Sequence, residues 1–227
     1  MLTFDTLREA NKRRLPLFKN KHGQPAHMRA DGSDWDFETW LMATIGELGE
    51  AAQVRIDLEA QHISFGTYKQ RITDELADTA TYLDILALRS LDMPLQDEDY
   101  EELEKNRATQ DHDPYITDAR LMMLCMSLLG QVANDCKKLY RGDMTSAEYQ
   151  SRKKDLVKSL LGSLTILQWS KGVKGQPSRA VHADGVNLGE AVVNKFNVVS
   201  DRVGAPIKIV KKHEDSFASY AGAYTIE

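Results

Sequence analysis

The sequence predicts an all-α fold, with a four-helix core made of two helical hairpins and with short helices near both ends. Apolar residues recur at helical spacing through most of the 227 residues, and few β-branched runs alternate as strands do. An offset of 81 residues, without a gap, places 45–91 on 126–172 with ten identical residues in 47 positions. This self-similarity indicates a tandem pseudo-repeat, within a single domain covering 1–227. The repeat predicts equivalent places for Gly49 and Gly130, and we expect glycine there because helices approach closely.

Each element follows from its apolar spacing and from the residues that begin or end it. A short amphipathic helix is expected over 3–14, and a loop rich in Gly, Pro and Asp over 22–34. The first hairpin (41–95) has helices from about 35 to 62 and from about 67 to 91, separated by a break at 64–66 and ended by Pro94.

The second half follows the same pattern. A charged segment over 96–113 leads into a second hairpin (116–172), with helices over 116–142 and 145–171. Glycines and a proline make 172–185 irregular. A last helix over 187–203 and a short strand over 207–210 make up a C-terminal segment, 187–210.

Composition restricts the class of protein. A formal charge of −5 argues against a surface that follows a nucleic-acid backbone. No apolar run reaches the roughly 20 residues that a membrane helix needs, and the N-terminal segment lacks the apolar centre of a signal peptide. Cys125 and Cys136 are too few for a disulfide framework or a zinc signature. We expect a soluble, cytoplasmic protein that binds neither nucleic acid nor membrane.

Two pairs of acids stand out in the first hairpin. Glu47 and Glu50 are three residues apart on one expected helix, and Glu75 and Asp78 are three apart on the next. Residues at this spacing lie on one face of a helix, so the hairpin can bring four carboxylates together. Such a group is stable only if a cation neutralises it, and hard divalent cations prefer oxygen ligands. The alternative is that these acids are solvated on outward faces.

These segments resemble a known family. IGELGEAAQ (45–53) and DELADTATYLDILA (74–87) are similar to the two metal-binding motifs of the MazG-like all-α nucleoside triphosphate pyrophosphohydrolases, of the phage and bacterial type. LGEAVVNKFNVVSDRVG (188–204) is similar to their phosphate-binding segment, and FDTLREANKRR (4–14) to their first helix. The sequence departs from the commoner motif by having Gly46 where many members have a glutamate.

The resemblance implies a set of site residues. Glu47, Glu50, Glu75 and Asp78 would bind Mg²⁺, with Mn²⁺ as a possible substitute, and Glu47 or Glu50 would activate water. Tyr82, Lys195 and Asn197 would contact the substrate. Family members associate as dimers or tetramers, so a homo-oligomer is a further expectation.

Other candidates come with competing interpretations. In the second hairpin Leu128, Gln131, Leu156 and Ser159 replace the four acids, so this half is expected to be degenerate and unable to hold the same metals. The basic helix end with Lys138 and Arg141 is a possible phosphate contact or a solvated helix terminus. Trp35 and Trp40 could stack on a base or pack in the core.

The sequence thus predicts a Mg²⁺-dependent hydrolase that converts a ribo- or deoxynucleoside triphosphate into its monophosphate and pyrophosphate, for nucleotide pool adjustment or house-cleaning. The alternative is a non-enzymatic helical scaffold, or a protein that only binds nucleotides or cations.

Overall fold

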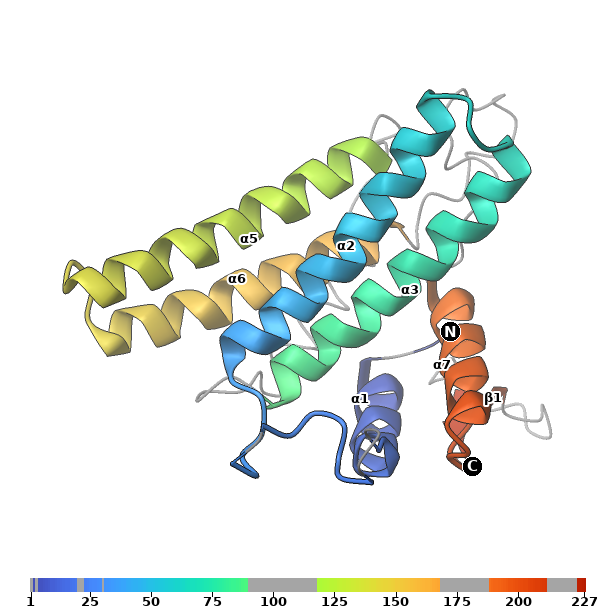
Figure 1. Ribbon diagram of the computed structural model, residues 1–227, viewed down its shortest axis with the longest axis horizontal. Coiled ribbons are helices and arrows are strands. Elements are labelled where there is room, and N and C mark those ends of the chain that lie inside the picture. The colour runs from blue at the N-terminus through green and yellow to red at the C-terminus, as the bar shows by residue number, and fades with distance from the viewer. Residues whose placement is uncertain are drawn as a thin grey trace, which may run out of the picture.

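The computed structural model describes residues 2, 4–19, 23–29, 31–89, 118–167, 188–211 and 224–227. The elements in chain order are α1 (Phe4–Arg14), the 3-10 helix η1 (Leu15–Leu17), α2 (Phe37–Glu59), α3 (Phe65–Arg89), α5 (Asp118–Arg141), α6 (Ser146–Leu167), α7 (Leu188–Arg202), β1 (Ile209–Lys211) and β2 (Tyr224–Ile226). Helices dominate the described residues, which confirms the all-α prediction (Figure 1). The predicted features over 96–113 and 172–185 lie outside the described residues.

Local capping sets where the first hairpin's helices begin. The carboxylate of Asp36 accepts a hydrogen bond from the Thr39 amide at 2.8 Å at the start of α2. The Ser64 hydroxyl accepts one from the Thr67 amide at 3.1 Å at the start of α3. The break between the helices covers 60–64, earlier than the predicted 64–66, because α2 ends at Glu59 and Ser64 caps a helix that begins at Phe65.

The second hairpin repeats the first at the predicted offset. α5 begins 81 residues after α2, and α6 begins 81 residues after α3. The turns also correspond, since Gln61 and Gly142 both have positive φ, 59° and 78°. Thr145 caps α6 as Ser64 caps α3, with its hydroxyl accepting from the Glu148 amide at 3.2 Å. Equal helix starts, turns and caps support the pseudo-repeat independently of residue identity.

The two hairpins pack as a pair. α2 contacts α5 and α3 contacts α6, so equivalent helices meet (Figure 1). The turns of the hairpins lie at opposite ends of the molecule (Figure 1). This arrangement is the one that an approximate two-fold axis between the repeats would produce. Equivalent residues fill the core between them, including Leu48 and Leu129, each exposed by 2% or less.

Two predictions about detail are wrong. Gly49 and Gly130 occupy equivalent places, as expected. The expected reason for the glycines is wrong: helices do not approach closely there, since a Cβ at either position would meet no atom within 4 Å. Both lie on exposed faces. The expected strand over 207–210 is also shifted: β1 covers Ile209–Lys211 and pairs antiparallel with β2, whose residues lay beyond the predicted elements.

α3 lies at the centre of the site region. It contacts α2 and α6 on one side of the molecule and α1 and α7 on another. α1 and α7 come from opposite ends of the chain, and both contact α3 (Figure 1). This position places α1 and α7 next to the acids that α3 carries. Among the helices the structure describes, none is both long and apolar enough to cross a membrane.

Candidate functional site

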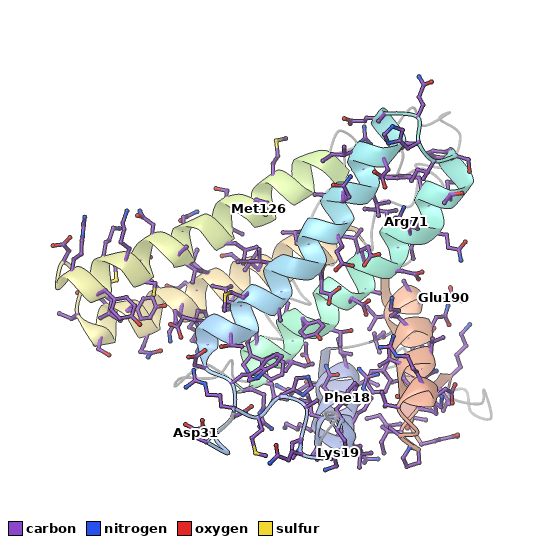
Figure 2. The ribbon with its side chains drawn as sticks, viewed as in Figure 1. Phe18, Lys19, Asp31, Arg71, Met126 and Glu190 are labelled. Atoms are coloured by element: carbon purple, nitrogen blue, oxygen red, sulfur yellow. The ribbon has the colours of Figure 1, made fainter. Side chains whose placement is uncertain are left out.

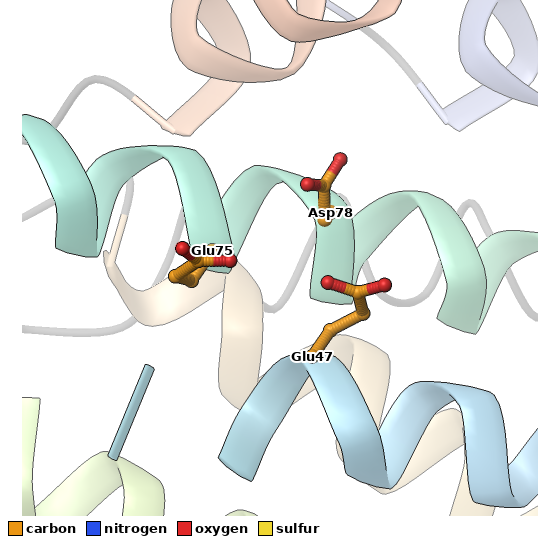
Figure 3. Close-up of side chains that lie close together, drawn as sticks. All are labelled: Glu47, Glu75 and Asp78. Atoms are coloured by element: carbon orange, nitrogen blue, oxygen red, sulfur yellow. The ribbon is translucent and has the colours of Figure 1, made fainter. Parts of the chain in front are cut away.

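Three of the four predicted acids converge. Glu47 from α2 and Glu75 and Asp78 from α3 each offer a carboxylate oxygen, and these oxygens lie within 4.8 Å of one another (Figure 3). All three side chains are half-buried. They meet because α2 and α3 pack along their whole length and because 75 and 78 are one turn apart on the same face of α3.

The acids raise one another's pKa. Burial, followed by the charges of Asp78, Glu50 and Glu75, raises the pKa of Glu47 from 4.5 to about 7. Burial is also the largest cause of the raised pKa values of Glu75 and Asp78. A carboxyl group whose pKa is raised by burial and by other carboxylates is one that a bound cation would stabilise in its charged form.

The donor set fits a hard divalent cation. It consists only of carboxylate oxygens, which are the ligands that Mg²⁺ and Mn²⁺ prefer. Ligands about 2.1 Å from Mg²⁺ lie up to about 4.2 Å apart across an octahedron, close to the 4.8 Å within which the oxygens of Glu47, Glu75 and Asp78 lie. Small side-chain movements would therefore bring all three to one ion, and water or phosphate oxygens would complete its coordination.

Glu50 differs from the other three acids. It is exposed one turn beyond Glu47 on α2 and does not belong to the converging group. Its charge nevertheless contributes to the raised pKa values of both Glu47 and Glu75, so it lies beside the cluster. Among the described residues this is the one group of three or more acids, cysteines or histidines that could hold a metal.

The second hairpin has no such cluster within its described residues. At the positions equivalent to Glu47 and Glu75, Leu128 and Leu156 belong to the hydrophobic core or pack against it. Apolar side chains therefore occupy two of the positions that hold acids in the first hairpin.

Lys195 on α7 faces the acids, as its substrate-contact prediction requires. Its Nζ lies 2.7 Å from Asp78 Oδ2, and both side chains are mostly buried. Burial disfavours the charged ammonium, but the hydrogen bond and charge of Asp78 outweigh it and raise the pKa of Lys195. The ammonium therefore stays charged beside the acids at neutral pH.

A pocket of about 140 Å³ opens next to this contact, between α1, α3 and α7. Glu47, Asp78, Tyr82 and Lys195 line it, so it includes two of the converging acids and two of the predicted substrate contacts. Burial raises the pKa of Tyr82, which keeps its hydroxyl protonated. The other lining residues are Asn11, Arg14, Leu15, Phe18, His27, Thr81, Ile85, Phe196, Val199 and Arg202.

Several of these lining residues were not predicted. Arg202 lies seven residues after Lys195 on α7, and therefore on the same helix face two turns away. Arg14 is 4% exposed, its Nη1 donates to the Phe196 carbonyl at 2.7 Å, and burial lowers its pKa to about 10, so it remains charged. Leu7, Asn11 and Arg14 share one face of α1. Two polar residues on the face that packs against the core were therefore the sequence signal that could have identified Asn11 and Arg14 as site residues.

Other predicted contacts lie elsewhere. Asn197 does not line the pocket: its Nδ2 donates to the Ile209 carbonyl at 2.8 Å and its Oδ1 accepts from the Ile209 amide at 2.9 Å. It therefore fastens β1 to α7. Lys138 pairs with Asp135 at 3.0 Å, and Arg141 pairs with Asp143, both near the turn of the second hairpin and away from the pocket. Their position favours the solvated helix terminus.

The tryptophans form part of an aromatic cluster. Trp40 is fully buried, and Trp35 packs against the core. Their ring centroids are 4.9 Å apart, and the ring of His27 lies 5.0 Å from Trp35 and 4.9 Å from Trp40. Neither tryptophan lines the pocket, whereas His27 does. The core-packing interpretation therefore holds for Trp40, and His27 is the member of the cluster that reaches the pocket.

No protein-family model matches the chain, and neither the curated proteins nor the solved structures include a significant match.

Proposed function

We propose that this protein is a Mg²⁺-dependent nucleoside triphosphate pyrophosphohydrolase. It would convert a ribo- or deoxynucleoside triphosphate into the monophosphate and pyrophosphate, and serve nucleotide pool adjustment or house-cleaning. The observation that supports this most is the convergence of Glu47, Glu75 and Asp78 beside a pocket that also contains Lys195 and Arg202. Acidic side chains that can bind a metal ion and basic side chains that can bind phosphates are therefore found at one pocket.

The acids divide into two roles in this proposal. Glu47, Glu75 and Asp78 hold the metal, because their oxygens converge. Mg²⁺, when bound, supplies charge neutralisation at the phosphates and lowers the pKa of a coordinated water. Glu50 lies next to the cluster without belonging to it, and in this proposal its carboxylate orients the attacking water and accepts its proton.

The reaction is a substitution at the α-phosphorus. The water oxygen forms a bond to the α-phosphorus, and the bond from that phosphorus to the bridging oxygen of the β-phosphate breaks. The bridging oxygen leaves with pyrophosphate, and the proton lost by water goes to the Glu50 carboxylate. Lys195 and Arg202 place positive charge along one face of α7, where they stabilise the charge that develops on the leaving pyrophosphate.

Pyrophosphate release is the direct test. The protein is incubated with each common ribo- and deoxynucleoside triphosphate in Mg²⁺, and the released pyrophosphate and monophosphate are measured. We expect the two products in equal amounts. Glu75→Gln should abolish release, because it removes a charge from the metal site but keeps side-chain size. Glu59→Gln is the matched control, since Glu59 lies on α2, pairs with Arg55 at 2.7 Å and is mostly exposed.

Two outcomes would contradict the proposal. Absence of turnover with every substrate would favour the alternative, a helical scaffold or a protein that only binds nucleotides or cations. Release of inorganic phosphate without pyrophosphate would place the cleaved bond elsewhere in the triphosphate and would refute attack at the α-phosphorus.

A further inference from the structure

The pocket has a second end, remote from the acids. Asn11 of α1 lines it and is hydrogen-bonded to Asp84, six residues along α3 from Asp78. At 1.5 Å per residue this spacing is about 9 Å along the helix axis. Phe18, which also lines the pocket, lies beside α1 (Figure 2). The pocket thus extends from a charged end at Asp78 to an end lined by Asn11 and aromatic rings.

Asn11 has an unmatched hydrogen-bonding group. Its side chain is fully buried, and its Nδ2 donates to Asp84 Oδ2 at 2.8 Å. Its Oδ1 is buried and has no hydrogen-bond partner among the described residues. A buried acceptor without a partner costs free energy and is uncommon in folded proteins. Asn11 lines the pocket and its Nδ2 is bound to Asp84, so Oδ1 is the polar side-chain atom left without a partner beside the pocket.

Asp84 holds this amide in one orientation. An ionised carboxylate can only accept hydrogen bonds, so the amide must direct its NH₂ group to Asp84 and leave its oxygen as the free atom. Burial raises the pKa of Asp84 to about 7, so the carboxylate is largely ionised at pH 8. Asp84 is fully buried and is not among the lining residues. It therefore acts as a positioning residue for Asn11.

We infer that the Asn11 end of the pocket binds the nucleobase, with Asn11 Oδ1 accepting a hydrogen bond from an N–H group on the edge of the base. This inference depends on the proposed function for the identity of the ligand as a nucleotide. The aromatic rings of Phe18 and His27 line the pocket and offer apolar surface to a flat ring, whereas the Arg14 guanidinium covers the Phe196 ring at 3.5 Å from its centroid.

Nucleoside binding without metal tests this inference. At pH 8 in a chelator, the affinities of the wild-type protein are measured for cytidine against pyrimidin-2-one riboside and for adenosine against purine riboside, by calorimetry. In each pair the second compound lacks the N–H donors of the base. We expect at least one donor-bearing nucleoside to bind about 5- to 100-fold more tightly than its donor-free analogue, since the analogue leaves Asn11 Oδ1 unmatched.

Variants connect this preference to the Asn11 amide. Asn11→Ala should remove the difference between the paired nucleosides. Asp84→Asn is a second variant of unchanged size: its amide can donate as well as accept, so Asn11 is no longer held in one orientation and the preference should fall. Asn134→Ala, at an exposed position on α5, is the matched control and should keep it. Thermal unfolding shows whether each variant is folded, which matters because Asn11 and Asp84 are buried.

The inference is overturned if no nucleoside binds the wild-type protein, if the donor-free analogues bind as tightly as their partners, or if the preference survives in a folded Asn11 or Asp84 variant. These results are separate from the test of the proposed function. A protein that releases pyrophosphate but shows no dependence on Asn11 refutes only the base site. A protein that binds nucleosides through Asn11 but releases no pyrophosphate refutes only the hydrolase.

Discussion

Glu47→Gln should stabilise the metal-free protein, because Glu47 is the acid that the cluster disfavours most clearly. Burial and the neighbouring carboxylates raise its pKa from 4.5 to about 7. A shift of this size corresponds to about 3 kcal/mol between the folded and unfolded states. Because the side chain is only half-buried, solvent screening reduces the expected effect to about 1–2 kcal/mol.

The sign of the effect depends on pH. Between pH 4.5 and about 7 the folded protein holds a proton on Glu47 that the unfolded chain has released, so stability falls as pH rises through this window. Above it the whole penalty is present, and below pH 4.5 it is absent. Glu47→Gln should therefore raise the free energy of unfolding at pH 8 by about 1–2 kcal/mol and leave it nearly unchanged at pH 4.

Urea unfolding followed by tryptophan fluorescence measures this difference. Both proteins are unfolded in a chelator at several pH values, and the difference between them isolates Glu47 from the other titrating acids. Glu59→Gln is the control, and it should change stability by less than about 0.5 kcal/mol. Added Mg²⁺ should stabilise the wild-type protein more than the Glu47 variant, because binding to the folded state shifts unfolding. This prediction is contradicted if the variant is less stable than wild type at pH 8, or if the difference in stability between the two proteins is independent of pH.

Three further predictions concern single residues. Lys195→Ala should lower kcat/KM for nucleoside triphosphates, with a loss of about 1.5–3 kcal/mol of transition-state stabilisation, because a charge-assisted contact is lost. An unchanged kcat/KM would show that this lysine has a structural role. Gly130→Ala should raise the free energy of unfolding by about 0.5–1 kcal/mol, since a Cβ there meets no neighbour in the helix, and chemical denaturation would show the opposite sign if α5 were closely covered. Trp40→Ala should cost about 3–5 kcal/mol of stability, because the side chain is fully buried; a folded variant with altered substrate ranking and unchanged thermal stability would restore the base-stacking interpretation.

Those features of the fold that depend on local interactions could be predicted from the sequence. Helix starts depend on side chains within four residues, as the caps at Ser64 and Thr145 show. The helix starts and turns of the two hairpins are separated by the same 81 residues as the matching sequence positions, because repeats with the same caps and apolar stripes fold locally in the same way. The Gly49 prediction failed because an exposed helix glycine and one at a close helix contact have the same local sequence.

Only part of the candidate site could be predicted from the sequence. Helical spacing predicts that Glu75 and Asp78 share a face, and a hairpin predicts that Glu47 meets them. Spacing alone could not show that Glu50 would lie outside the converging group, because this depends on the rotation of α2 against α3. Asn197 shows the same limit: a motif placed it near substrate, but its amide groups bind the backbone of Ile209.

The helical elements, the repeat and the pairing of acids along the first hairpin can be predicted from the sequence, because they follow from hydrogen bonds and side-chain periods within one or two turns. The residues that face those acids depend on tertiary packing. The contact of Lys195 with Asp78 joins residues 117 positions apart, and that of Asn11 with Asp84 joins residues 73 apart. Such contacts depend on how α1 and α7 pack against α3, and that geometry is set by the shapes of many core side chains at once.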